Sequence, residues 1–309
     1  MKIEKMLIAV DLSDTANTAA RYAATQFAPD AEVILLHVID PVRRPRFAPE
    51  TFPSEDALES IAREYATRRM AELSTSLARS RVRSEIRVGR PEEQVAAMAS
   101  EIGASIVVIG PHGDRPRPWK FLGTTADRIT RTCRVPILVA TNPAEHSPRR
   151  ILVPVDDDGI ASEVLASTRD LAERFDADIA LLYVVSNAVY GHVASMSYAT
   201  TSDDARAEQE IEKELAGAAA RWLAEIARTG VNRDRVSSEA AYGNAGEVTV
   251  ETAARLNADL IVIGRRGSGL VRPALLGSTV ATVLHGARCP VLVVTSPTDA
   301  RSNRPRDED

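Results

Sequence analysis

Two stretches of this sequence share one pattern of glycines followed by a hydroxyl residue. The pattern is G-x2-G-x9-G-[ST], found in GPHGDRPRPWKFLGT from residue 110 and in GRRGSGLVRPALLGS from residue 264. A short apolar run precedes each copy, and the copies lie 154 positions apart. One match could arise by chance. Two matches in register predict a duplicated domain in which both copies carry the same chemistry.

The placement of these glycines predicts a cradle for phosphate groups. We expect the first glycine of each copy to end a strand and the last to open a helix, whose first backbone N–H groups lack partners within the helix. Such a terminus attracts anions, and the hydroxyl residue that follows adds a donor. No lysine follows in the manner of a Walker loop. A dinucleotide fingerprint would follow the first strand of its unit, where this chain has no glycine pair.

The elements that must hold the glycines are short apolar runs separated by helical segments. Such runs, apolar on both faces, are typical of parallel strands covered on both sides. Alternation of strands with helices predicts an α/β fold of two repeated doubly wound domains, each a five-stranded parallel sheet of order 3-2-1-4-5. The strand candidates are 6–10, 33–39, 83–89, 106–110 and 136–140 in the first copy, and 151–155, 179–185, 237–243, 260–264 and 290–294 in the second.

The clearest helical segment spans residues 54–79. Its apolar residues recur at helical spacing, which predicts one buried face. The predicted face comprises Leu58, Ile61, Tyr65, Met70, Leu73 and Leu77.

The repeat register divides the chain into a first domain over residues 1–141 and a second over 149–296. The second copy is about eight residues longer, by the register offsets, between its second and third strands, within SNAVYGHVASMSYATTSDDA. We expect a mobile loop there. The tail, residues 297–309, has no apolar face and is expected to be disordered.

An acidic residue follows the first strand of each copy: Asp11 in AVDLSD and Asp156 in PVDDDG. In the predicted strand order the first and fourth strands are neighbours, and ligands bind in the crevice at their carboxyl ends. Each carboxylate would therefore face a glycine loop, where it could accept hydrogen bonds from a ribose. The alternative is that each simply caps the following helix.

Together these features resemble the universal stress protein family of the ATP-binding type, present here as a tandem pair. The resemblance rests on the doubled glycine motif, the two aspartates, HVID at 37–40 and GRP at 89–91, and it extends from about residue 3 to residue 295. It implies that one or both copies bind an adenine nucleotide, ATP accompanied by Mg²⁺. The implied site residues are Ala9, Asp11, Ser13, Val38, Gly110, His112, Gly113, Gly123 and Thr124 in the first copy, and Pro154, Asp156, Val184, Gly264, Arg266, Gly267, Gly277 and Ser278 in the second.

Composition narrows the possible partners and location. A net charge of −5 argues against a general nucleic-acid binder. The N-terminal apolar run is too short for a signal peptide, and no segment reaches the roughly 18 apolar residues that a membrane helix needs. We therefore expect a soluble, cytoplasmic protein without membrane contacts. The two cysteines, Cys133 and Cys289, are expected to be packing residues rather than metal ligands.

Two other functions remain open from the sequence: slow ATP hydrolysis or nucleotidyl transfer, and a nucleotide-free interaction module. His112 could be taken for a catalytic base, but the second copy has Arg266 there and no acidic or nucleophilic partner is evident. We therefore assign no catalytic residue. The triplet 156–158 suggests a metal site, but adjacent side chains point apart, so we expect no protein-built metal centre. One carboxylate could still touch nucleotide-bound Mg²⁺.

The last strands, PILVA at 136–140 and PVLVV at 290–294, would be apolar sheet edges, which invite pairing. The resemblance implies antiparallel association through them, either between the two domains or in a homodimer, beside an unidentified regulatory partner. The two sites are expected to be unequal. The first loop carries two prolines and a tryptophan, so we expect the second copy to bind Mg²⁺-ATP more tightly.

Overall fold

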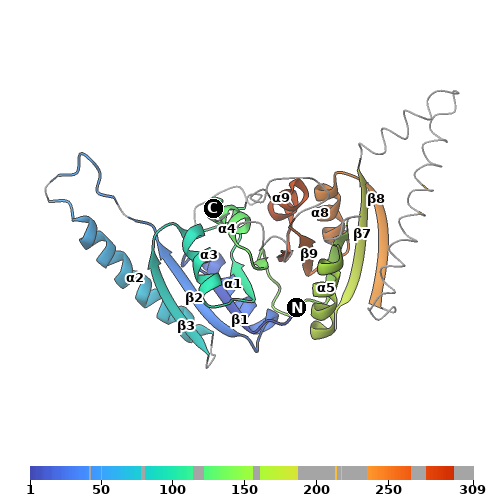
Figure 1. Cartoon of the computed structure of the whole chain (residues 1–309), viewed down its shortest axis with the longest axis horizontal. Coiled ribbons are helices and arrows are strands. Elements are labelled where there is room, and N and C mark those ends of the chain that lie inside the picture. The colour runs from blue at the N-terminus through green and yellow to red at the C-terminus, as the bar shows by residue number, and fades with distance from the viewer. Residues whose placement is uncertain are drawn as a thin grey trace, which may run out of the picture. The chain divides into compact units, whose positions relative to one another are not determined.

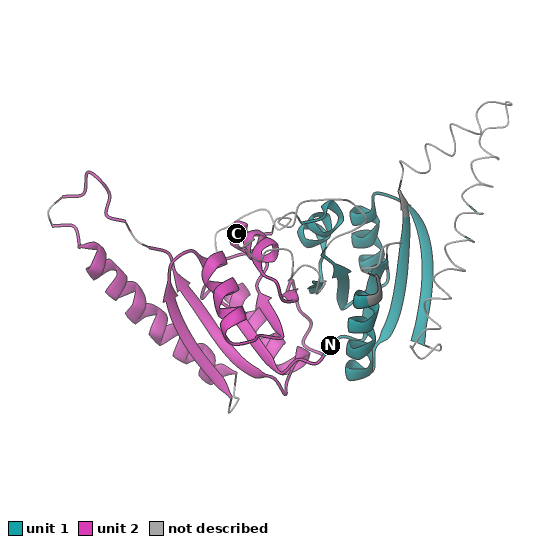
Figure 2. Ribbon diagram, in the orientation of Figure 1, with its two compact units in different colours: residues 1, 148–272, 276–296 teal, residues 2–147, 273–275, 297–309 magenta. Residues whose placement is uncertain are grey.

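A computed structural model of the chain describes residues 1–41, 43–49, 51–77, 81–113, 122–155, 161–186, 213, 217, 235–265 and 276–295. The chain forms two compact units, shown in different colours in Figure 2. The N-terminal unit, magenta, holds residues 2–147, and the C-terminal unit, teal, holds residues 148–272 and 276–296. The expected long loop of the second copy and the tail lie outside the described residues.

The N-terminal unit alternates strands and helices along the chain (Figure 1). Its strands pair in parallel in the order β3-β2-β1-β4-β5, as the sequence predicts. The elements are β1 (Lys5–Ala9), α1 (Asp14–Tyr22), a π-helical turn η1 (Ala23–Phe27), β2 (Glu32–Ile39), α2 (Glu55–Ser76), β3 (Val82–Val88), α3 (Pro91–Glu101), β4 (Ile106–Ile109), α4 (Thr124–Thr132) and β5 (Ile137–Val139).

The C-terminal unit repeats the same topology. Its strands pair in parallel in the order β8-β7-β6-β9-β10, which is again 3-2-1-4-5 within the repeat. The described elements are β6 (Arg150–Val155), α5 (Ala161–Phe175), β7 (Asp178–Ser186), β8 (Val236–Gly243), α8 (Ala245–Arg255), β9 (Leu260–Gly264), α9 (Ser278–Gly286) and β10 (Val291–Val294).

The central strands are buried on both faces, which explains their continuous apolar runs. Met6, Leu7 and Ile8 of β1 are fully buried, as are the first three residues of β4 and of β9. Helices cover both faces because parallel strands need crossover connections. Both cysteines are also buried, and burial raises the pKa of the Cys289 thiol to about 12. This agrees with packing roles for the cysteines.

The predicted buried face of α2 is partly wrong. Ile61 and Tyr65 are 60% and 50% exposed, whereas Ala66, Met70 and Leu73 are buried. The buried positions follow an i, i+4, i+7 spacing that is rotated around the helix from the stripe containing Ile61 and Tyr65. Apolar residues therefore occupy two faces of α2, and only one of them packs on β2 and β3. The spacing of the apolar residues alone does not show which of the two faces is buried.

Candidate functional site

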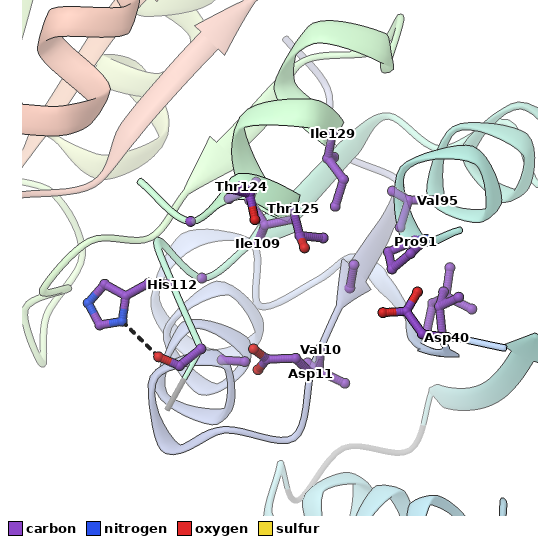
Figure 3. A pocket seen from close by; sticks show the side chains of 18 residues that line it. Val10, Asp11, Asp40, Pro91, Val95, Ile109, His112, Thr124, Thr125 and Ile129 are labelled. Carbon is purple, nitrogen blue, oxygen red and sulfur yellow. Dashed lines mark hydrogen bonds between the residues drawn. The ribbon is translucent and has the colours of Figure 1, made fainter. Parts of the chain in front are cut away.

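A cavity of about 460 Å³ opens at the carboxyl ends of the strands in the N-terminal unit (Figure 3). This volume lies within the range of small-molecule sites, roughly 300–1,000 Å³. Its position is where a doubly wound sheet binds ligands, since β1 and β4 are neighbours whose connections leave in opposite directions. The lining residues are Ala9, Val10, Asp11, Ala16, Leu36, Val38, Asp40, Pro91, Val95, Ile109, Gly110, His112, Gly113, Gly123, Thr124, Thr125, Ala126 and Ile129.

The end of β1 is fixed against β2 before it enters the cavity. The backbone N–H of Val10 donates to the carbonyl of Leu36 at 2.9 Å. The ring Nδ1 of His37 lies 2.8 Å from the carbonyl oxygen of Val10. These two bonds hold the backbone directly before Asp11 in place, so the position of the carboxylate depends on strand pairing and not on a free loop.

Asp11 does not cap the following helix. Ser13 is the N-cap of α1, and its hydroxyl accepts from the backbone N–H of Ala16 at 3.1 Å. Asp11 Oδ1 accepts from the N–H of Ser13 at 3.1 Å. Between them Leu12 takes a left-handed conformation with φ 66°, which costs about 1 kcal/mol for a residue with a Cβ. This turn leaves the carboxylate of Asp11 at the cavity.

The glycines allow the protein to pack closely against itself. A Cβ on Gly113 would collide with Asp11 Oδ2, and a Cβ on Gly110 would lie 3.3 Å from Cα of Ala16 in α1. A Cβ on Gly123 would lie 3.3 Å from Cα of His112 and 3.4 Å from the carbonyl oxygen of Pro111. The glycine motif predicts room for phosphate at these positions. In the structure the space beside these glycines is filled by β1, α1 and the β4 loop, which draws these elements around the cavity.

The start of α4 provides an anion-attracting end. Gly123 is its N-cap and offers no side chain to the first-turn N–H groups. The N–H of Gly123 donates to the carbonyl of Pro111 at 2.7 Å, which ties the helix start to the β4 loop. Thr124 and Thr125, which open the helix, both line the cavity. Backbone donors, two hydroxyl residues and the positive end of the helix dipole therefore meet at one edge of the cavity.

Eight of the nine site residues predicted in the first copy line this one cavity. The exception is Ser13, which is buried and occupied as the helix cap. His112 is at the cavity edge, and its Nδ1 lies 3.1 Å from the carbonyl oxygen of Gly113 (Figure 3). Asp40 and Pro91 also line the cavity; they belong to the HVID and GRP segments but were not among the predicted site residues. The apolar wall formed by Leu36, Val95, Ile109 and Ile129 was not predicted either.

In the C-terminal unit the helix start after β9 has the same form. Gly277 is the N-cap of α9, with φ −58° and ψ 147° against −62° and 147° at Gly123. Its N–H donates to the carbonyl of Arg265 at 3.4 Å, as Gly123 does to Pro111. Pro154 and Val184 lie on the adjacent strands β6 and β7, Gly264 ends β9 and Ser278 opens α9. Asp156, Arg266 and Gly267 lie outside the described residues.

Comparison with known proteins agrees with this repeated architecture. A model of the universal stress protein family matches residues 2–141 and again 148–295. The chain belongs to the universal stress protein family. It is similar to a universal stress protein of Mycolicibacterium smegmatis, with 27% identity over 301 residues that cover 94% of this chain and 96% of the relative. A family member from Methanocaldococcus jannaschii is 32% identical over 155 residues, covering 50% of this chain and 85% of the relative.

A solved structure has the same fold over nearly the whole chain. The crystal structure of a universal stress protein from Archaeoglobus fulgidus superposes with a TM-score of 0.64 at 19% identity, covering 94% of this chain and 96% of the other. Among the described residues of this family member, no helix is both long and apolar enough to cross a membrane. The described residues also contain no group of three or more His, Cys, Asp or Glu side chains suited to a metal ion.

Proposed function

We propose that this universal stress protein binds ATP with Mg²⁺ and plays a nucleotide-dependent regulatory role in a cytoplasmic stress response. The observation that carries the proposal is the N-terminal cavity, in which an acidic residue, a glycine loop and a helix N-terminus meet beside an apolar wall. These three surfaces match the three parts of a nucleotide: ribose, phosphates and base.

The phosphates occupy the edge formed by Gly113, Gly123 and the start of α4. Backbone N–H donors and a helix dipole favour negative charge there. Asp11 would repel phosphates, but it is a strong acceptor for hydroxyl groups, so the ribose belongs beside it. Mg²⁺ would be held mainly by the phosphates, because the described residues offer it no cluster of ligands.

The base occupies the apolar part of the cavity, next to Val38 and the wall behind it. A flat aromatic ring gains from leaving water there, at roughly 25 cal/mol per Å² of apolar area buried. The sheet supports this order of groups: the phosphate loop follows β4, Asp11 follows the neighbouring strand β1, and Val38 lies on β2 beyond it. A nucleotide thus lies across the carboxyl edge of the sheet.

The test compares nucleotide content and affinity in the wild-type chain and in Gly113→Val. Protein purified without added nucleotide is denatured, and the released small molecules are separated by ion exchange; Mg²⁺-ATP is then titrated into nucleotide-free protein by calorimetry. The valine displaces Asp11 and is expected to weaken binding at the first site at least about tenfold, the equivalent of about 1.4 kcal/mol. Ala71→Val adds bulk at an exposed position of α2 and serves as the matched control.

Retained nucleotide, or binding that Gly113→Val weakens and Ala71→Val leaves unchanged, supports the proposal. A chain that neither retains nor binds any nucleotide contradicts it and favours a nucleotide-free interaction module. Turnover of ATP well above background would instead favour an enzyme.

We further propose that the apolar last strands, β5 and β10, mediate association, either between the two domains of one chain or between two chains. The last strand of a sheet can pair with a further strand through its outer backbone groups, and the residues of β5 and β10 are apolar and buried. Light scattering of the purified protein distinguishes a monomer from a dimer. A charged substitution, Leu292→Glu, is expected to change the assembly state or to destabilise the chain.

A further inference from the structure

The large apolar side chains that stay exposed among the described residues gather in one region of the N-terminal unit. They are Phe47, Phe52, Ile61 and Tyr65, with exposed fractions of 95%, 36%, 60% and 50%. The first two belong to the segment that leads from β2 into α2, and the other two lie on α2. The backbone N–H of Arg44 donates to a carboxylate oxygen of Glu55 at 2.8 Å, which ties this segment to the helix start. Exposed apolar side chains gathered in one place mark an interaction surface.

The outer face of α2 points away from the sheet. The helix packs on β2 and β3 through its buried positions, and no described element of the N-terminal unit covers the opposite face (Figure 1). The residues of this outer face recur at alternating spacings of four and three, the pattern of the facing positions in a two-helix coiled coil. All six are exposed: Ala57, Ile61, Glu64, Arg68, Ala71 and Thr75.

The middle of this row holds two charged residues that form no ion pair within the described chain, Glu64 and Arg68. Their neighbours are occupied, because Arg63 and Arg69 each pair with a glutamate about one turn away, at 3.2 and 2.9 Å. The Cζ atom of Arg68 lies 6.0 Å from the ring centroid of Tyr65, so the arginine and the ring form one continuous surface. The outer face therefore presents one acidic and one basic group beside its apolar side chains.

An antiparallel pair of α2 helices would set these charges against each other. With a two-fold axis beside Ala66, Glu64 of one copy lies opposite Arg68 of the other, because each is two positions from Ala66. The same axis sets Ile61 opposite the small Ala71, each five positions away, and the end positions of the row pair in the same way. The outer face of α2 is thus complementary to itself under a two-fold rotation, as a closed homodimer requires.

We propose that the outer face of α2 binds the same face of a second copy of this chain, with the helices antiparallel and two Glu64–Arg68 ion pairs at the centre. The acidic first turn of α2 and the arginines of its second half favour this orientation, since a parallel pair would bring like charges together. Burial of Ile61 and Tyr65 supplies most of the affinity, and the ion pairs fix the register. No residue of α2 lines the nucleotide cavity, so this association is independent of nucleotide binding.

Charge reversal tests the central ion pairs, with self-association of the full chain followed by sedimentation velocity over a wide range of protein concentration. Glu64→Arg and Arg68→Glu each place like charges opposite each other twice, and each should weaken the dimer at least about tenfold. The double variant restores opposite charges and should return the dissociation constant to within about threefold of the wild-type value. Ile61→Ser should weaken the dimer about tenfold. Glu251→Arg, the same charge change at an exposed position of α8, is the matched control.

Disulfide trapping tests the register. Glu64→Cys and Arg68→Cys chains, one of them carrying a tag so that the mixed dimer is recognised by size, are combined and oxidised. Helices that pack about 8–10 Å apart bring opposite Cα atoms within reach of a disulfide. Glu64→Cys combined with Thr75→Cys is the matched control, because these positions are about 10 Å out of register. The native Cys133 and Cys289 are buried and do not compete. We expect the first mixture to cross-link at least about tenfold faster than the second.

Circular dichroism checks that each variant is folded, and titration of Mg²⁺-ATP should give the wild-type affinity in all of them. A chain that stays monomeric at every concentration, or an assembly that Glu64→Arg leaves intact, would overturn the inference without affecting the proposed nucleotide site. A double charge reversal that fails to restore association, or equal cross-linking of the two mixtures, would also overturn it.

Discussion

The turn after the third strand of each repeat has the same backbone conformation in both copies but carries different side chains. Gly89 and Gly243 have φ angles of 143° and 136°, a region that only glycine adopts readily. The next residues are Arg90 and Pro91 in one copy, but Asn244 and Ala245 in the other. The backbone conformation of the turn is therefore the same in both copies, while the side chains that follow the glycine differ.

The different side chains after the glycine change how the next helix is capped, and in the first copy they place Pro91 in the cavity wall. Asn244 caps α8, its side-chain oxygen accepting from the N–H groups of Gly246 at 3.0 Å and Glu247 at 3.2 Å. The start of α3 has no side-chain cap, and Pro91 at its first position lines the cavity. The two copies thus share the glycine that shapes the turn and differ in the helix cap and in the residue at the first helical position.

The largest loss of nucleotide affinity is expected from substitutions of the two helix N-cap glycines, each of which should affect one site only. Gly123→Val places side-chain atoms against the backbone of Pro111 and His112, so the start of α4 must move. We expect the first site to lose the alignment of its backbone donors and to weaken more than tenfold per donor lost. Gly277→Val should do the same for the second site alone. Calorimetric titration of Mg²⁺-ATP into each single variant and the double variant measures both sites. Two single variants with wild-type stoichiometry and affinity would show that the N-caps do not form the phosphate sites.

The next effect tests the acidic residues after the first strands. Asp11→Ala and Asp156→Ala each remove a carboxylate that we propose as an acceptor for the ribose, and we expect a loss of about 5- to 50-fold at the affected site. Residues 157 and 158 of the second copy are also aspartates, and extra carboxylates favour a triphosphate that carries Mg²⁺. The second site should therefore be the tighter one with Mg²⁺ and should lose more affinity when EDTA removes the metal. Equal affinities at the two sites, unaffected by EDTA, would contradict this difference.

A smaller effect distinguishes a cap from a ligand at Ser13. The hydroxyl of Ser13 is occupied by the N–H of Ala16 and the residue is buried. Ser13→Ala should therefore lower the free energy of unfolding by about 1 kcal/mol, as measured by chemical denaturation. The affinity for Mg²⁺-ATP should stay within about twofold, because the structure gives Ser13 no place in the cavity wall. Loss of affinity without loss of stability would restore Ser13 to the binding site.

Most of the fold followed from features that are local in the sequence. Runs such as 260–264 have no polar side chain, as expected of a strand covered on both faces, and the structure forms β9 at those residues. The repeat register then placed the equivalent elements of both copies. The buried face of α2 could not be obtained in this way, because Ile61 and Tyr65 have the spacing of a buried stripe and only packing on the sheet decides between two apolar faces.

Part of the candidate site could also be predicted from features that are local in the sequence. Asp11 and the glycines stand directly after strands, so strand order alone brings them to one edge. Asp40 also follows a strand, but its position in the second copy is held by Ser186, so the repeat did not mark it as it marked Asp11 and Asp156. The actual neighbours of Gly110 and Gly113, which are Ala16 and Asp11, depend on how closely α1 and β1 pack and could not be deduced from the motif.

The smallest expected effect tests whether the two turns after the third strands are interchangeable. Asn244→Ala leaves two first-turn N–H groups of α8 without their side-chain acceptor and should destabilise that helix start by about 1 kcal/mol. Arg90→Asn places the same cap before α3. It removes an ion pair with Glu93, at 3.3 Å between side chains that are 73% and 61% exposed, which contributes little.

Arg90→Asn should therefore stabilise the start of α3 by several tenths of a kcal/mol, up to about 1 kcal/mol. Hydrogen exchange of the amides in the first turns of α8 and α3 measures each helix separately. We expect faster exchange in α8 of Asn244→Ala and slower exchange in α3 of Arg90→Asn. Because Pro91 stays in place, nucleotide affinity at the first site should not change in Arg90→Asn. Unaltered exchange in α3 would mean that a proline at the first position already leaves the helix start in a conformation that the asparagine side chain cannot cap.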